Sequence, residues 1–251
     1  MAPKKSDTIA VWFSCGAASA VAASETIRRY GDICHIRIIN NPVAEEDDDN
    51  RRFLSDVERW LNHPVEIAVS KKYPDNSAVS VWDHRKFMSG PLGAPCTKEL
   101  KKNVRQQWEK ENRVDWHVLG FTSDERGRYE RFVTTERENV LPVLIEKGIS
   151  KAECYQILIE SGIVLPRVYR MGYPNANCIG CVKSTSATYW NHVRVMNNSV
   201  FLARAEQSRR IGAKLVRHNG ERIYLDELPP DAIGKPMKSM DFECGIFCEE
   251  R

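Results

Sequence analysis

The hydrophobic residues of this chain fall into short runs that alternate with stretches favouring helices. The runs with the length and alternation of β-strands are residues 9–13, 33–39, 65–69 and 114–119. The stretches that favour helices are residues 17–30, 51–61 and 97–111. Strands that alternate with helices predict an α/β fold with a doubly wound, mainly parallel sheet. In that architecture ligands bind at the carboxyl ends of the strands.

The junction between the first predicted strand and the first predicted helix carries small and hydroxylated residues. Ser14, Cys15 and Gly16 follow the strand, and Ala17 and Ser19 begin an Ala-rich stretch without Gly or Pro. A helix N-terminus presents backbone N–H groups and the positive end of the helix dipole, and the serine hydroxyls add donors. The junction is therefore a candidate phosphate-binding loop, although any α/β domain has junctions with small residues.

The strand–helix alternation ends near residue 140. Ser150 and Glu153 form a capping box that predicts a helix, a second helical stretch covers 188–213, and Asn219-Gly220 predicts a hairpin. We therefore expect a nucleotide-binding α/β domain at residues 1–140 and a helical, cysteine-bearing region at residues 141–251 packed on it. The segment 231–242 has little periodicity and is expected to be a flexible connection that lets the tail fold back.

Charge and length restrict the class of protein. The chain has 251 residues, and its 37 Lys and Arg against 34 Asp and Glu do not indicate a non-specific nucleic-acid binder. The basic stretch from Lys98 to Lys110 is more simply a solvated helix face than a nucleic-acid contact. The acidic run at 45–49 favours a solvated helix start, or else places Asp48 or Asp49 near a nucleotide or its magnesium.

The sequence contains neither an apolar stretch long enough to span a bilayer nor a secretory signal. We therefore expect a cytoplasmic protein with no membrane segment. In such a reducing compartment cysteines serve metal or redox chemistry more often than disulfides. The eight cysteines of this chain thus point to a chemical role for any that cluster.

Cys178 and Cys181 form a C-x-x-C motif around Gly180, a spacing that lets two thiolates bind one metal ion or cluster. A redox dithiol and two unrelated core cysteines are the alternatives. Three other cysteines have apolar surroundings and are expected in the core: Cys15, Cys34 and Cys154. The remaining ones lie at a loop–helix boundary or near the chain end: Cys96, Cys244 and Cys248. The C-x-x-C pair, Cys96 and one tail cysteine form a candidate four-thiolate set for zinc or a [4Fe–4S] cluster.

The Ser14–Ser19 loop resembles the S-G-G-x-D-S phosphate loop (PP-loop) of the N-type ATP pyrophosphatases and of their relatives, the phosphoadenosine phosphosulfate (PAPS) reductases. Ser14, Gly16 and Ser19 occupy matching positions, whereas Cys15 replaces a glycine and Ala18 replaces the acid. The resemblance implies an adenine nucleotide alpha hydrolase-like fold. It also implies that Ser14, Cys15, Gly16, Ala17 and Ser19 bind an adenine nucleotide.

A second motif carries the same resemblance. Gly120, Glu125 and Arg128 match a G-x-R-x-x-E-S-x-R pattern of the PAPS-reductase-like family, with Thr122 and Arg126 departing from it. The resemblance implies that Glu125 and Arg128 belong to the nucleotide site. A guanidinium group at Arg128 suits a phosphate or sulfate.

The tail FECGIF resembles the E-C-G-[LI]-H ending of sulfonucleotide reductases, whose cysteine attacks the sulfate sulfur, and this implies that Cys244 is the nucleophile. Cys96 followed by the C-x-x-C motif resembles the cluster-bearing adenylyl-sulfate (APS) reductases. Thr97 occupies the second place of their CC pair, and Phe247 replaces their histidine. The implied metal ligands are Cys96, Cys178, Cys181 and Cys248. The reverse assignment of the two tail cysteines and a cluster with three protein ligands stay open.

These motifs imply a sulfonucleotide reductase-like enzyme that acts on APS or PAPS and is regenerated by a thioredoxin-like reductant. An alternative in the same superfamily binds ATP, adenylylates an acceptor and delivers sulfur to it, with nucleic acid as a partner. The third hypothesis is a zinc-stabilised, non-catalytic nucleotide-binding protein.

Overall fold

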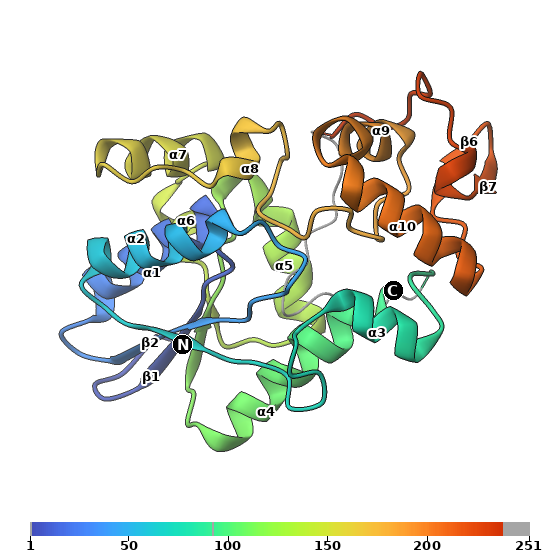
Figure 1. The fold of residues 1–251 in the computed structure, drawn as a ribbon. Coiled ribbons are helices and arrows are strands. Elements are labelled where there is room, and N and C mark those ends of the chain that lie inside the picture. Colours follow the sequence, from blue (N-terminus) through green and yellow to red (C-terminus); the bar gives the residue numbers. More distant parts are fainter. Residues whose placement is uncertain (1, 92, 238–251) are drawn as a thin grey trace. The chain divides into compact units, whose positions relative to one another are not determined.

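The computed structural model describes residues 2–91 and 93–237, and its main element is a five-stranded parallel sheet (Figure 1). The strands are β1 (Thr8–Trp12), β2 (His35–Asn40), β3 (Val65–Ile67), β4 (Trp116–Val118) and β5 (Val140–Leu141). Their order in the sheet is β3-β2-β1-β4-β5, and every neighbouring pair is parallel. The predicted doubly wound parallel sheet is confirmed, and β5 adds a strand that was not predicted.

The strand order creates a switch point beside β1. The chain leaves β1 for β2 and then β3 on one side, and later returns to β4 on the other side of β1. The carboxyl ends of β1 and β4 therefore flank the crevice in which open α/β sheets bind their ligands. Every residue of β1 is buried, which explains why its apolar run is continuous rather than alternating.

The chain divides into two compact units. The sheet unit comprises the chain up to Pro42, Asp48–Ala68 and Arg105–Arg167. The C-x-x-C unit comprises Val43–Asp47, Val69–Val104 and the chain from Val168. The expected division into a nucleotide-binding α/β domain at residues 1–140 and a helical, cysteine-bearing region at residues 141–251 stays a prediction.

The helices of the sheet unit surround its sheet. They are α1 (Ala17–Tyr30), α2 (Asp49–Leu61), most of α4 (Asn103–Glu111), η2 (Ser123–Glu125), α5 (Arg126–Thr135), α6 (Val143–Lys147) and α7 (Lys151–Glu160). Helix α1 contacts β1, β2 and β4 as well as α6 and α7. Its alanines keep the helix thin, so that its backbone approaches the sheet closely. The capping box of Ser150 and Glu153 at the start of α7 is confirmed.

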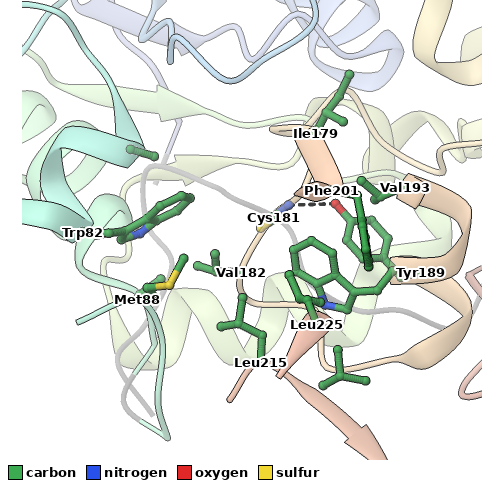
Figure 2. Packing of buried hydrophobic residues seen from close by; sticks show 14 of the residues in the cluster. Trp82, Met88, Ile179, Cys181, Val182, Tyr189, Val193, Phe201, Leu215 and Leu225 are labelled. Carbon is green, nitrogen blue, oxygen red and sulfur yellow. Dashed lines mark hydrogen bonds between the residues drawn. The ribbon is translucent and has the colours of Figure 1, made fainter. Parts of the chain in front are cut away.

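The C-x-x-C unit has its own hydrophobic core (Figure 2). Its helices and strands are α3 (Ala78–Arg85), the π-helix η1 (Thr97–Lys102), most of α8 (Arg167–Arg170), α9 (Ala187–Met196), α10 (Asn198–Ile211), β6 (Val216–His218), β7 (Glu221–Ile223) and η3 (Leu225–Glu227). Trp82 and Trp190 are among its largest fully buried side chains. The predicted hairpin is confirmed, because β6 and β7 pair across Asn219 and Gly220, both with positive φ.

The segment 231–242, which was expected to be a flexible connection, is held by hydrogen bonds in its described part, up to residue 237, and its flexibility stays a prediction. The Asn191 amide donates to the carbonyls of Pro229 and Ala232, both at 2.9 Å, and the Ser186 hydroxyl donates to Lys235 at 2.8 Å. Met237 packs against the core of the unit. Polar side chains of α9 therefore hold this segment through backbone contacts that sequence periodicity does not reveal.

Within the described part of the chain, the helices are all too short or too polar to cross a membrane.

The buried His117 of β4 makes the stability of the sheet unit depend on pH. Its Nδ1 accepts a hydrogen bond from the Trp12 indole N–H at 3.1 Å. Burial, assisted by the charges of Arg137 and Arg105, lowers the pKa of His117 from 6.5 to about 3. Because the unfolded chain takes up this proton and the folded chain does not, the stabilisation is present above pH 6.5 and is lost as pH falls towards 3.

We expect the free energy of unfolding to fall through His117 by up to about 1.4 kcal/mol per pH unit between pH 6 and 4. The variant His117→Gln should flatten this slope in urea titrations at several pH values. His35→Gln, at an exposed position of β2, is the control and should keep the slope. An unchanged slope in His117→Gln would contradict the assignment.

Candidate functional site

The Ser14–Ser19 loop lies at the carboxyl end of β1 and brings two hydroxyl groups together. The Oγ atoms of Ser14 and Ser19 are 3.2 Å apart, and the Ser14 N–H donates to the Ser19 Oγ at 3.2 Å. Ser19 Oγ donates to the Gly16 carbonyl at 2.9 Å, and Ala20 N–H donates to the same carbonyl as α1 begins. The first turn of α1 contains no acidic residue. The loop therefore combines hydroxyl groups with the positive end of a helix, as an anion site requires.

Cys15 takes a conformation in the loop that favours glycine. Its φ is +56°, and only 2% of its surface is exposed. The Asn40 amide at the end of β2 donates to the Cys15 Sγ at 3.5 Å and to the Phe13 carbonyl at 2.7 Å. Asn40 thus holds both the end of β1 and the left-handed residue that follows. This geometry explains why the resembling phosphate loop has glycine at the position of Cys15.

Gly120, which follows β4, lies directly against the first turn of α1. A Cβ atom on Gly120 would lie 2.7 Å from the Ser19 nitrogen and 2.9 Å from the Ala18 carbonyl carbon. These neighbours are backbone atoms, which cannot move aside without displacing the helix start. The chain after β4 and the loop after β1 are therefore in close contact at the switch point of the sheet.

Glu125 and Arg128 bind one another. The Thr122 N–H and Oγ1 donate to the Glu125 carboxylate at 3.2 and 3.3 Å, and the Arg128 guanidinium donates to it at 2.6 Å. The Arg128 guanidinium also lies over the Phe121 ring, 5.2 Å from its centroid. Residues 123–135 form η2 and α5, and Thr122 and Glu125 make a capping box at their start. The role of Glu125 and Arg128 in nucleotide binding stays a prediction.

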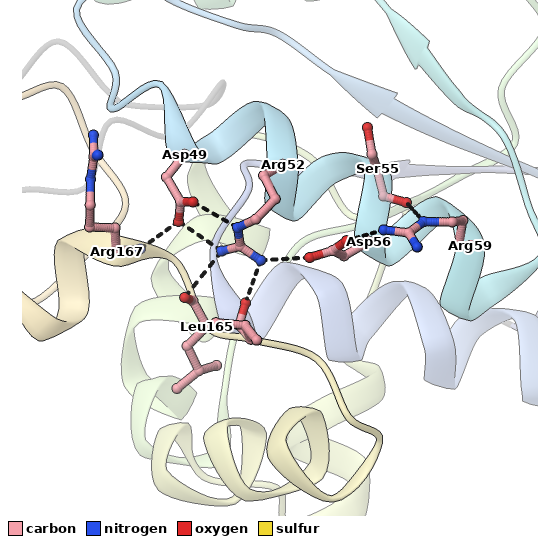
Figure 3. A network of polar contacts seen from close by, with 8 residues as sticks. Asp49, Arg52, Ser55, Asp56, Arg59, Leu165 and Arg167 are labelled. Atoms are coloured by element: carbon pink, nitrogen blue, oxygen red, sulfur yellow. Dashed lines mark hydrogen bonds and ion pairs between the residues drawn. The ribbon is translucent and has the colours of Figure 1, made fainter.

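Asp49 belongs to an ionic network within the sheet unit (Figure 3). Arg52 donates to Asp49 at 2.7 Å, to Asp56 at 2.6 Å and to the Val164 carbonyl at 2.9 Å. The Arg167 N–H donates to the Asp49 carboxylate at 2.7 Å. Hydrogen bonding to Arg52 lowers the pKa of Asp49. Asp49 thus joins α2 to the segment that follows α7, a structural role that sequence reasoning did not assign.

The acidic residues just before Asp49 also have structural partners, in the C-x-x-C unit. The Glu45 carboxylate accepts hydrogen bonds from the Ser77 hydroxyl at 2.6 Å and from the Ala78 N–H at 2.7 Å, and so caps α3. Glu46 forms an ion pair at 3.0 Å with Lys101, which is buried. Lys101 belongs to the basic stretch from Lys98 to Lys110, which was expected to be a solvated helix face. Because Lys101 is buried, it is not part of such a face.

The C-x-x-C turn is fixed on both sides (Figure 2). The Ile179 N–H donates to the Glu45 carbonyl at 2.9 Å, and the Cys181 N–H donates to the Tyr189 hydroxyl at 2.8 Å. Gly180 has a φ of +71°, and a Cβ atom there would lie 2.9 Å from the Val200 Cγ1. The turn therefore requires glycine for its conformation and for its space, and it is built by tertiary contacts as well as by the motif.

Three of the four predicted ligands lie at one hydrophobic core. Cys181 belongs to the core of the C-x-x-C unit, and Cys96 and Cys178 pack against that core. Cys96 immediately precedes the π-helix η1. Over residues 2–91 and 93–237, no three His, Cys, Asp or Glu side chains are grouped closely enough to hold a metal ion. Cys244 and Cys248 lie outside the described residues.

The cysteines expected in the core are indeed buried: Cys15, Cys34 and Cys154. Burial raises the pKa of the Cys154 thiol to about 12, so this thiol is a poor nucleophile and a poor metal ligand at neutral pH.

Arg204 of α10 is a buried cation near the C-x-x-C turn that sequence reasoning missed. Burial lowers its pKa, and the nearby Glu45, Cys178, Tyr189 and Cys181 oppose that shift. A buried cation favours the thiolate form, which is the form that binds metals. The chemistry of Cys178 and Cys181, two thiols beside a buried cation, therefore suits thiolate ligation. An arginine among the apolar positions of 188–213 was the available sequence signal.

No family model and no curated protein matches the chain. Among solved structures, it is similar to the phosphoadenylyl-sulfate (PAPS) reductase from Candida auris in complex with phosphate. That similarity has 12% identity and a TM-score of 0.48, and it covers 71% of this chain and 82% of the reductase.

The chain is also similar to the U34-tRNA thiolase NcsA from Methanococcus maripaludis with its [4Fe–4S] cluster. Here the identity is 11% and the TM-score 0.46, over 82% of this chain and 67% of the thiolase. At these identities and TM-scores, the similarities assign neither a reaction nor a ligand to this chain.

The contact between Gly120 and α1 predicts a specific loss of stability. Gly120→Ala should lower the free energy of unfolding by about 1–3 kcal/mol, because the new methyl group overlaps backbone atoms of Ala18 and Ser19. Gly127→Ala in α5 is the matched control, because nothing lies within 4 Å of its Cβ position. That variant should be neutral or stabilising by up to about 1 kcal/mol. The free energies of unfolding of the two variants are measured by urea titration. Equal values would contradict the contact between Gly120 and α1.

The C-x-x-C turn predicts a second loss. Gly180→Ala should cost more than Gly212→Ala, because both positions have positive φ but the Cβ position of Gly212 has nothing within 4 Å. The left-handed conformation alone should cost about 1–2 kcal/mol in each variant. Adding Val200→Ala to Gly180→Ala should remove most of the difference. Equal unfolding free energies for the two single variants would show that the turn has room for a side chain.

Proposed function

We propose that this chain is a sulfonucleotide reductase-like enzyme that binds an adenine nucleotide at the Ser14–Ser19 loop. The observation that carries the proposal is the contact between this loop and Gly120 at the switch point of the sheet. The two segments that resemble the family's nucleotide motifs are 100 residues apart in sequence, yet their backbones touch. Both motifs thus lie at the edge of the sheet where open α/β sheets bind their ligands.

The loop supports phosphate recognition through its own groups. In the proposal, the Ser14 and Ser19 hydroxyls and the backbone of Cys15, Gly16 and Ala17 surround the phosphate, aided by the dipole of the 14-residue α1. Ala18 places no carboxylate beside them. This absence of an acid favours a reaction in which the anion is bound without a metal ion at the loop.

Arg128 is the proposed contact to the sulfate or phosphate oxygens. Its ion pair with Glu125 and its position over the Phe121 ring restrict its rotamers, so that binding would lose less side-chain entropy. Glu125 acts in this proposal through Arg128, as the residue that positions the guanidinium.

The proposed reaction begins with the Cys244 thiolate attacking the sulfonyl sulfur of APS or PAPS. A sulfur–sulfur bond forms, the bond from sulfur to the bridging phosphate oxygen breaks, and the nucleotide leaves with that bonding pair. The enzyme is left as an S-sulfonated cysteine. A thioredoxin-like dithiol then supplies two electrons, releases sulfite and becomes a disulfide.

Cys96, Cys178, Cys181 and Cys248 would hold a [4Fe–4S] cluster, or zinc as the alternative. Such a group supplies positive charge and ties together the segments that carry its ligands. The anchoring of Met237 at the core of the C-x-x-C unit supports a tail ligand. At ~3.3–3.6 Å per residue, the chain from Met237 can extend about 25 Å to Cys244 and about 40 Å to Cys248.

ATP-dependent sulfur transfer to a nucleic acid or other acceptor is the second candidate. The packing of three cysteines at one core favours it, because three protein ligands would leave one iron of a cluster open for sulfur. The anionic loop ligand would then be ATP, and the first product would be pyrophosphate.

We expect the anaerobically purified full chain to contain iron and to release sulfite from APS or PAPS when a thioredoxin-like reductant is present. Cys244→Ser should abolish sulfite release because it removes the nucleophile. Ser14→Ala should weaken nucleotide binding by roughly 10- to 100-fold, the effect of losing a hydrogen bond to a charged group. Metal analysis, a sulfite assay and nucleotide titration measure the three effects.

Cys34→Ser is the control for the nucleophile. Its thiol donates to the Lys4 carbonyl at 3.5 Å, and a serine hydroxyl can replace that contact. Pyrophosphate release from ATP without sulfite from either sulfonucleotide would reject reduction in favour of sulfur transfer. Stoichiometric zinc without any nucleotide turnover would instead support the non-catalytic hypothesis.

A further inference from the structure

Arg204 is buried in the C-x-x-C unit, and no carboxylate of the described residues forms an ion pair with it. Its side chain is 4% exposed. Its Nη1 donates to the neutral Gln207 Oε1 at 2.5 Å, and its guanidinium lies over the Trp82 ring, 4.5 Å from the centroid. Arg105 of the sheet unit, the other fully buried arginine in the described part of the chain, forms an ion pair with Glu109 at 3.1 Å. Arginine is rarely buried unless it is paired with an anion, so the position of Arg204 requires an explanation.

The Nε–H of Arg204 is buried and makes no hydrogen bond within the described residues. A buried donor without an acceptor costs about 1–3 kcal/mol, and more when it is charged. This nitrogen is 3.8 Å from the Cβ position of Gly180, the residue between the two cysteines of the motif. The unsatisfied donor therefore faces the turn where the proposed metal ligands lie.

Glu45 does not neutralise Arg204 directly. Its carboxylate is occupied by the Ser77 hydroxyl and by the Ala78 and Val79 N–H groups of α3, at 2.6, 2.7 and 3.2 Å. The other groups that interact electrostatically with the Arg204 charge are Cys178, Tyr189 and Cys181. Glu45 contributes most to the electrostatic stabilisation of the Arg204 charge, although it does not contact the guanidinium. Thiolate sulfur at the C-x-x-C turn would add negative charge beside the unsatisfied Nε–H.

We propose that Arg204 is the charge-balancing residue of the C-x-x-C metal site, and that its Nε–H is held ready for an acceptor on the bound metal–sulfur group. The inference rests on the metal site in the proposed function. Arg204 is not a ligand in this proposal. It acts through Cys178 and Cys181, because a fixed positive charge and an N–H donor beside thiolates favour their metal-bound form. Gln207 and Trp82 hold the guanidinium in position.

The test is a titration of the anaerobically prepared, metal-free full chain with Co²⁺. Thiolate-to-cobalt absorbance reports ligation by cysteine, and Cys178→Ser and Cys181→Ser identify the site. Arg204→Gln removes the charge and should weaken cobalt affinity by roughly 10- to 100-fold, the usual effect of losing a residue that supports metal ligands. Arg204→Lys keeps the charge and should recover most of the affinity.

Arg194→Gln is the matched control. Arg194 is a half-buried arginine of α9 in the same unit, and it lies over the Phe201 ring, 4.3 Å from the centroid. Burial alone lowers its pKa, with no thiol contributing. Arg194→Gln should therefore bind cobalt as the unmodified chain does, although it also loses a buried cation and an aromatic contact.

Several results would overturn the inference. One is unchanged cobalt affinity in Arg204→Gln. Another is an equal loss of cobalt affinity in Arg204→Gln and Arg204→Lys that is proportional to their loss of unfolding free energy. That result would show that Arg204 has a purely structural role. If Arg204→Gln does not fold, Arg204→Lys still decides, since affinity more than about 100-fold below that of the unmodified chain would reject charge balance. An unmodified chain without cobalt–thiolate absorbance would reject the metal site itself.

Discussion

The loop after β1 and the first turn of α1 are held on two sides, and the proposed nucleotide site depends on these contacts. Gly120 after β4 leaves no room for a side chain against Ala18 and Ser19. On the other side, Asn40 at the end of β2 binds Phe13 and Cys15, and so maintains the left-handed residue that redirects the chain into the helix. Residues at the carboxyl ends of β2, β1 and β4 thus together fix the conformation of the Ser14–Ser19 loop. The parallel sheet makes this arrangement available, since parallel strands place their carboxyl ends at the same edge.

The C-x-x-C unit solves a different problem, which is how to keep a chelating turn rigid inside an apolar core. Its turn is hydrogen-bonded to Glu45, which is distant in sequence, and to Tyr189, which lies eight residues after Cys181. Gly180 fits between Val200 and Arg204. The buried charge of Arg204 would be destabilising in a purely hydrophobic core. Its presence is consistent with a core that also serves a site for anionic sulfur. The sheet unit shows the contrasting arrangement, in which Arg105 and Arg137 are both paired with Glu109.

The features that sequence predicted well have local signals. The four strands β1 to β4, the Ser150 capping box and the Asn219-Gly220 hairpin each follow from a few adjacent residues. The two-residue strand β5 carries too little pattern to be recognised. The helix α5 was missed because its start depends on a capping box within a polar segment. Likewise, the sequence identified the candidate phosphate loop and the C-x-x-C motif, but not Asn40 or Arg204. Their importance arises from tertiary contacts, to which a single sequence gives no direct access.

The anchored segment that ends at Met237 has a kinetic consequence. Asn191, Ser186 and Thr188 fasten its backbone to α9, so that the following chain starts from the core that holds Cys178 and Cys181. A reaction between a tail thiol and that core is then intramolecular, with an effective concentration on the order of millimolar for a short tether. Its rate would be independent of protein concentration. Dilution in a cell would not slow it, and free thiols at lower concentration would compete poorly for the same site.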